Sequence, residues 1–171
     1  MLVLSDTHVP GRARRLPRPV YEALAQADAI LHAGDLDSED VLDELAAFAP
    51  VYAVAGNVDP PEVWRRLPRR LLVELAGYRV GLIHGDGADR RRAADLAAAA
   101  FPGADAVVFG HTHRPLLERR GNLLLFNPGS ATDRRGEPRC SFGWLHLEDG
   151  FGRVLRAEHV FFDDDQASRA P

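Results

Sequence analysis

Short apolar runs recur along the chain and end in glycine or in a polar residue. A run of this kind is typical of a buried strand. The runs predict strands at Met1–Leu4, Ala29–Ala33, Val51–Ala55, Leu71–Leu75, Tyr78–Ile83, Ala106–Phe109, Leu116–Glu118, Leu123–Phe126, Phe142–Leu147 and Val154–Val160. The residues Ala76-Gly77, between the fourth and fifth of these runs, predict the turn of a hairpin.

Three stretches between the runs have the composition and spacing of helices. In Pro17–Ala27 apolar residues recur on one face, and the proline suits the first helical turn. In Ser38–Phe48 the serine can cap the helix, and the acidic residues after it favour the first turn. The third stretch, Asp89–Phe101, is rich in alanine. Strands and helices alternate first, and strands then follow one another, which predicts an α/β fold: a four-layer α-β-β-α sandwich of two packed mixed sheets flanked by helices.

The length of 171 residues fits one domain. We expect residues 1–162 to form it and the polar segment 163–171 to be a flexible tail. The single cysteine, Cys140, excludes an intrachain disulfide and fits a reducing cytoplasm, which is the expected location. No apolar run approaches 18 residues, so neither a signal peptide nor a membrane contact is expected.

The formal net charge is −4, which argues against polymeric nucleic acid as a partner. All 21 basic residues are arginines, often in doublets, and most of them fit a solvated surface. Because arginine binds phosphate through two parallel hydrogen bonds, one or two of them near a site would suit substrate contacts.

Residue types that bind metal ions stand at the ends of five predicted strands. Because ligands of α/β proteins collect at the carboxyl ends of strands, the loops that carry these residues are expected to converge. Two pairs are spaced two residues apart, which on an extended segment directs both side chains to the same side. Imidazole, carboxylate and amide groups together suit Mn, Fe, Zn or Co rather than Ca. The residues are Asp6, His8, Asp35, Asn57, His84, His111 and His113.

Each of these residues alone has an ordinary structural explanation. A single Asp or Asn at a strand end usually caps a turn, and a single His is more often a core or surface residue than a ligand. His32, His146 and His159 are assigned to this structural class. The set of seven at five strand ends, four of them with an adjacent glycine, is not explained in this way.

The motifs, in this order, resemble the calcineurin-like metallophosphoesterase superfamily. They are Asp6-Thr7-His8, Gly34-Asp35, Gly56-Asn57-Val58-Asp59, His84-Gly85 and Gly110-His111-Thr112-His113. The short length and the segment Asn127-Pro128-Gly129-Ser130 resemble its small bacterial and archaeal phosphodiesterase branch, which is related to the retromer scaffold subunit. The resemblance covers roughly residues 1 to 160 and implies that the turn at 127–130 lies beside the site.

The resemblance implies two divalent transition-metal ions per chain, with Mn favoured and Fe, Zn, Ni or Co as alternatives. A hydroxide that bridges the two ions would attack phosphorus in line, so a dinuclear phosphodiesterase acting on a small phosphate ester is expected. The implied catalytic residues are Asp35, Asn57 and His111. The implied ligands are Asp6, His8 and His113 for the first ion, Asn57, His84 and His111 for the second, and Asp35 as the bridge.

Val58 departs from the pattern, because many relatives carry at this place a histidine that protonates the leaving group. Valine cannot donate a proton, which favours esters with good leaving groups and diesters over monoesters. The alternative from another class is a catalytically weak protein-interaction scaffold with the same fold. A nuclease would need further segments, and a protein or dinucleotide phosphatase would need the missing histidine. The physiological substrate, the cellular metal, the proton donor and the oligomeric state, a homo-oligomer included, stay open.

Overall fold

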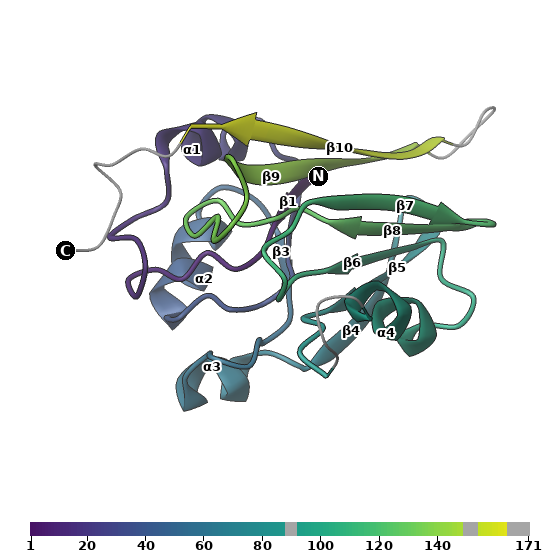
Figure 1. The fold of residues 1–171 in the computed structure, drawn as a ribbon, viewed down its shortest axis with the longest axis horizontal. Coiled ribbons are helices and arrows are strands. Elements are labelled where there is room, and N and C mark those ends of the chain that lie inside the picture. The colour runs from purple at the N-terminus through teal and green to yellow at the C-terminus, as the bar shows by residue number, and fades with distance from the viewer. Residues whose placement is uncertain (88–91, 149–153, 164–171) are drawn as a thin grey trace.

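In the computed structural model, which describes residues 1–87, 92–148 and 154–163, two five-stranded mixed sheets form the centre of the molecule (Figure 1). The first sheet has the order β10-β9-β1-β2-β3 and the second the order β4-β5-β6-β8-β7. The strands of the first sheet are β1 (Leu2–Leu4), β2 (Ile30–His32), β3 (Val51–Ala53), β9 (Cys140–Glu148) and β10 (Val154–Phe162). The strands of the second sheet are β4 (Arg70–Leu75), β5 (Tyr78–Ile83), β6 (Ala106–Phe109), β7 (Leu116–Arg120) and β8 (Leu123–Asn127).

Parallel strands occupy the part of each sheet from which the candidate residues come. In the first sheet β1, β2 and β3 are parallel, while β9 pairs antiparallel with β1. In the second sheet β5, β6 and β8 are parallel, and the antiparallel strands β4 and β7 lie at its edges. The carboxyl ends of the parallel strands therefore meet at one edge of each sheet, where their loops can share ligands.

Alternation along the central strand β1 shows how the layers pack. Leu2 and Leu4 belong to a core cluster on the outer face of the first sheet, and Val3 belongs to the cluster between the two sheets. Because successive side chains of a strand point to opposite faces, one short strand contributes to both clusters. Each of these residues is almost fully buried, and burial of a side chain of this size stabilises the fold by about 1.5–3 kcal/mol.

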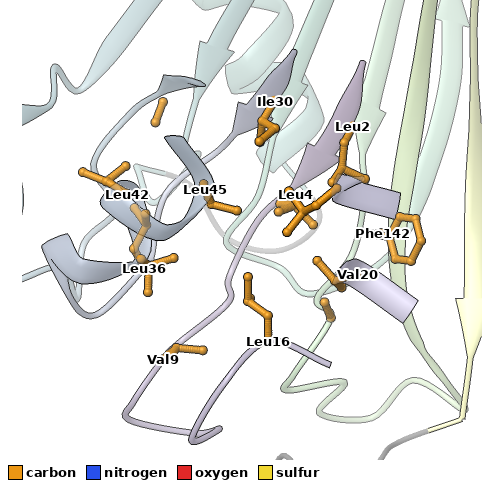
Figure 2. Packing of buried hydrophobic residues seen from close by; sticks show 14 of the residues in the cluster. Leu2, Leu4, Val9, Leu16, Val20, Ile30, Leu36, Leu42, Leu45 and Phe142 are labelled. Atoms are coloured by element: carbon orange, nitrogen blue, oxygen red, sulfur yellow. The ribbon is translucent and has the colours of Figure 1, made fainter. Parts of the chain in front are cut away.

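Helices cover the outer faces of both sheets. Figure 2 shows Leu2, Leu4 and Ile30 packed among side chains of α1 (Arg18–Leu24) and α2 (Glu39–Ala46), including Val20 and Leu45. The outer face of the second sheet packs against α4 (Ala93–Ala100), an alanine-rich helix whose small side chains allow a close approach. The predicted four-layer α-β-β-α sandwich is confirmed.

The element boundaries differ from the predictions at several places. The first helix ends at Leu24 rather than Ala27, and β3 ends at Ala53 rather than Ala55. The start of the alanine-rich helix was expected at Asp89, and residues 88–91 lie outside the described residues. The short helix α3 (Pro61–Arg66) was not predicted, because six residues are too few to show an apolar stripe.

The domain prediction for residues 1–162 stays a prediction, and most of the expected tail, residues 164–171, lies outside the described residues. No helix in the described part of the chain is long and apolar enough to span a membrane.

Candidate metal centre

All seven predicted ligand residues lie together at the carboxyl ends of the strands. Asp6 and His8 follow β1, and Asp35 and Asn57 follow the next two strands of the same sheet. The second sheet contributes the other three residues, His84, His111 and His113. Two groups have ligand atoms within 4.8 Å of one another: Asp6, His8 and His113, and Asp6, Asp35 and His84.

In the first group the ring protons point away from the centre of the group. Nδ1 of His8 donates to Oδ1 of Asp37 at 2.9 Å, and Nδ1 of His113 donates to the carbonyl oxygen of Asp133. The two Nε2 atoms lie 3.3 Å apart, and that of His113 lies 3.3 Å from Oδ1 of Asp6. With its proton on Nδ1, each imidazole presents a lone pair at Nε2.

The surroundings of Oδ1 of Asp6 indicate whether these residues can bind a cation. This oxygen is buried, and it has no hydrogen-bond partner among the residues that the structure describes. Burying an oxygen without a hydrogen-bond partner costs free energy. The lone pairs on Nε2 of His8 and His113 also face this oxygen and repel it. A proton or a metal ion among the three atoms would remove both costs. The donor set of one carboxylate and two imidazoles therefore fits a divalent transition-metal ion.

In the second group His84 is oriented in the same way. Its Nδ1 donates to the carbonyl oxygen of Ala33 at 2.8 Å, and its Nε2 lies 3.1 Å from Oδ2 of Asp35. Oδ1 of Asn57 lies 3.1 Å from Nε2 of His84 and 3.1 Å from Nδ1 of His111. Asp6, Asp35 and His84 are buried, but Asn57 is exposed and His111 is half-buried, so the second group is open to solvent on the side of these two residues and the first group is not.

The carboxylates and histidines of the site shift one another's pKa values. Burial would raise the pKa of Asp6, but contact with His113 and the charge of His84 lower it well below the usual range. Burial would lower the pKa of His84, but Asp35 and Asp6 raise it to about 9. Burial also opposes the rise in the pKa of His8, which the contact with Asp37 and the carboxylates of Asp6 and Asp35 cause. The neighbouring carboxylates therefore favour positive charge at His8 and His84.

Left-handed backbone conformations bring the side chains together, and the expectation of extended segments was wrong. The φ angle is 52° at Asp6, 45° at His8, 59° at Asp35, 66° at His111 and 58° at His113. Each such residue costs on the order of 1–2 kcal/mol. Aspartate and histidine accept this conformation more readily than most residues, and such residues cluster at functional sites. Convergence therefore arises from sharp turns after the strands rather than from side-chain alternation.

Asp59 connects two of the loops that carry candidate ligands. Its carboxylate accepts hydrogen bonds from four backbone N–H groups, and the side chain is buried. The donors are Asp35 at 3.0 Å, Leu36 at 2.7 Å, Asp37 at 2.9 Å and Gly56 at 2.7 Å. Asp59 thereby fixes the loop after β2 against the loop after β3. Gly56 must approach closely, since a Cβ there would overlap the carboxylate of Asp35.

The turn at residues 127–130 lies beside the loops, as the resemblance implied. Nδ2 of Asn127 donates to the carbonyl oxygen of Gly110 at 2.9 Å, and the hydroxyl of Ser130 donates to the carbonyl oxygen of Asp6 at 2.7 Å. Just beyond the turn, the Thr132 hydroxyl donates to the carbonyl oxygen of Thr7 at 2.6 Å. These contacts hold the loops after β1 and β6 from the side.

The three histidines assigned to structural roles lie outside both groups. His32 accepts from the N–H of Gly34 at Nδ1 and donates through Nε2 to the Thr7 hydroxyl at 3.0 Å. Burial lowers the pKa of His32 to about 3, so it is neutral. His146 contacts Glu158 between β9 and β10, and Nε2 of His159 donates to the carbonyl oxygen of Asn127 at 2.8 Å.

Sequence reasoning missed three supporting aspartates. The carboxylate of Asp37 orients the ring of His8, the backbone carbonyl oxygen of Asp133 orients the ring of His113, and Asp59 organises the backbone around them. Asp59 closes the Gly-Asn-Val-Asp motif, which is a signal that could have found it. Such outer contacts fix the ring tautomers of metal-binding histidines.

Comparison with known proteins shows to which class this fold and site belong. A family model for the calcineurin-like phosphoesterase superfamily domain matches residues 1–150. A protein of Methanothermobacter thermautotrophicus named probable metallophosphoesterase is 44% identical over 131 residues, which are 76% of this chain and 76% of that protein.

Two solved structures have the same fold. Vacuolar protein sorting 29 from Cryptosporidium parvum matches with a TM-score of 0.75 at 23% identity, covering 95% of this chain and 97% of that one. Vps29 from Entamoeba histolytica, complexed with zinc, matches with a TM-score of 0.73 at 25% identity, covering 95% and 98%.

The fold is that of the metallophosphoesterases, hydrolases of phosphate esters that bind divalent metal ions, and the described residues include groups that could hold such an ion. The chain belongs to the calcineurin-like phosphoesterase superfamily. The resemblance stated from the motifs is therefore confirmed.

Proposed function

We propose that this chain is a dinuclear metal-dependent phosphodiesterase, with Mn²⁺ as the favoured ion. The position of Asp35 carries the proposal: its Oδ2 lies 3.1 Å from Nε2 of His84 and 3.9 Å from Nε2 of His8. One oxygen thus lies near both candidate ligand groups, which supports a bridge between two ions. The zinc in the Entamoeba Vps29 structure is a property of that protein, and it makes Zn²⁺ the first alternative to test.

Each candidate residue has a proposed role. When bound, two such ions supply the activated nucleophile and offset charge on the phosphate oxygens. Asp37 and the carbonyl oxygen of Asp133 hold the rings of His8 and His113 with their Nε2 atoms inward. The exposed Asn57 and the half-buried His111 mark the side from which the phosphate approaches. The proposed ligands are Asp6, His8 and His113 for one ion, Asn57, His84 and His111 for the other, and Asp35 for both.

A protein-interaction scaffold is the second candidate, because the structures that share the fold include Vps29 proteins. The likeness to the Cryptosporidium protein, at 23% identity, concerns the fold alone. The ligand set favours the enzyme, since all seven positions carry residues that can bind a metal ion and their donor atoms converge.

Metal analysis tests the proposed stoichiometry. The purified chain, loaded with Mn²⁺ and desalted, is expected to retain about two equivalents by elemental analysis. His84→Ala should lower the content by about one equivalent, while His146→Ala, which changes a histidine outside the site, should not. A folded chain that retains no metal would favour the scaffold instead.

Val58→His tests the absence of a proton donor. The side chain of Val58 is 52% exposed, and its N–H donates to Oδ1 of Asp35 at 3.1 Å, so an imidazole can be placed beside the site. A general acid contributes about 10²–10⁴-fold when the leaving group is poor. The variant is therefore expected to accelerate alkyl esters selectively and to leave the rate on nitrophenyl diesters almost unchanged.

Val58→Phe is the matched control, because it adds a ring without a proton to donate. Both variants must retain the metal content of the wild type, since a new imidazole can also capture an ion. If Val58→His accelerates alkyl and aryl esters alike, protonation of the leaving group is not what the wild type lacks.

A further inference from the structure

A hollow of about 260 Å³ opens directly beside the candidate centre. Its lining residues are Asn57, Trp64, Arg69 and Asp86. Asn57 belongs both to this hollow and to the proposed ligand set, so a group in the hollow would be adjacent to a bound phosphate. A cavity of about 150 Å³ accommodates benzene, and the hollow is therefore large enough for an aromatic ring.

The walls of the hollow are fixed to the loop that carries Asn57. Nε1 of Trp64, on α3, donates to the carbonyl oxygen of Gly56 at 2.9 Å. Nη1 of Arg69 donates to the same oxygen at 2.7 Å, and its guanidinium carbon lies 5.7 Å from the centre of the Trp64 ring. A side chain of α3 and one from the segment just before β4 (Arg70–Leu75) thus converge on the residue that precedes a proposed ligand.

The large exposed area of Trp64 offers a surface that a ligand could cover. The residue is 49% exposed although its indole N–H is hydrogen-bonded and its ring is fixed. Covering an exposed aromatic surface is favourable, and a flat ring that stacks on it adds a contact of defined geometry. The site therefore offers a rigid aromatic wall rather than a mobile surface side chain.

The charges of the hollow balance each other. Nη2 of Arg69 lies 2.6 Å from Oδ2 of Asp86, so the guanidinium is already paired with a carboxylate. An anionic group of a ligand would have to compete with the carboxylate of Asp86 for Arg69. A neutral ring meets no such competition.

We propose that this hollow binds a planar aromatic ring carried by an ester group of the substrate. Both a nucleobase and a simple aryl group have this chemistry. The assignment of the ring to a substrate rests on the proposed phosphodiesterase function, whereas binding of the ring does not require turnover.

Measuring how tightly phosphonates bind to the Mn²⁺-loaded protein tests the aromatic-ring hollow separately from the proposed phosphodiesterase function. Phenylphosphonate is expected to bind about tenfold more tightly than methylphosphonate, because its ring can stack on an aromatic side chain and the methyl group cannot. Trp64→Ala should reduce this ratio to about one. Trp64→Phe keeps a ring but loses the hydrogen bond to Gly56, so it should retain most of the preference. Phe48→Ala, at another exposed aromatic residue, should leave the ratio unchanged.

Fluorescence gives a second measurement. In a Trp144→Phe background Trp64 is the remaining tryptophan, and its emission should change on addition of phenylphosphonate but not of methylphosphonate. A nucleoside 5′-monophosphate that binds more tightly than phenylphosphonate identifies a nucleobase, and the reverse order identifies an aryl group. Equal binding of the phenyl and methyl compounds overturns the aromatic hollow even in an active enzyme. An inactive protein that still prefers the phenyl compound contradicts only the proposed function.

Discussion

Asp35→Asn is expected to lower turnover on an activated phosphodiester by roughly 10³-fold, the loss that follows removal of a preorganised electrostatic contact in other enzymes. Oδ2 of Asp35 lies near the ring nitrogens of both His84 and His8, and the neutral amide cannot balance the charge of two divalent ions. Oδ1 accepts the N–H of Val58, and an asparagine oxygen can keep that contact. Loss of activity should therefore occur in a folded chain.

Steady-state kinetics, metal analysis and circular dichroism measured together check this result. Asp43→Asn is the matched control, because Asp43 is an exposed residue that pairs with Arg66 on the surface. That variant should retain wild-type turnover. If Asp35→Asn binds two ions and remains fully active, Asp35 is not the bridge.

Asp59→Ala should produce the largest loss of stability, about 3–5 kcal/mol in the free energy of unfolding, which is a large fraction of the total for a domain of this size. The substitution leaves four backbone N–H groups, three of them buried, without their acceptor. It also releases the loop of Asp35 from the loop of Asn57, so metal affinity should fall by about 10–100-fold.

Urea denaturation with and without Mn²⁺ measures both effects. Asp59→Asn should be intermediate, since its amide oxygen can accept one pair of the hydrogen bonds while its nitrogen faces the other pair. A loss below about 1 kcal/mol in the alanine variant would mean that water replaces the carboxylate without cost.

Local sequence signals were sufficient for the sheets and for the candidate ligands. Runs such as Ala106–Phe109 are apolar throughout because parallel strands are buried on both faces, and a polar residue at their end is therefore conspicuous. The histidine pair at 111 and 113 follows that strand directly. Its position beside Asp6 also depends on the packing of the two sheets, since β1 and β6 belong to different sheets, and on the left-handed turns after both strands.

The remaining features depend on contacts between distant parts of the chain. Asp37 and Asp133 are ordinary loop residues in the sequence, and their roles appear only when the carboxylate of Asp37 contacts the ring of His8 and the backbone carbonyl oxygen of Asp133 contacts the ring of His113. The left-handed turn at Asp6 has no local signature comparable to a glycine. Trp64 meets Arg69 at the carbonyl oxygen of Gly56, a meeting that no periodicity could indicate.

The position of β1 at the middle of the first sheet has a consequence for synthesis of the chain. Its neighbours are β2, about thirty residues later, and β9, near the other end of the chain. Contacts of such long range slow folding, because a large loop must close before they form. Ser130, which holds the loop of Asp6, is also made late. A ribosome therefore completes every candidate ligand residue before it completes the strand and the turn that fix the first of them, so the metal centre can reach its final geometry only after residues 140–148 have been made.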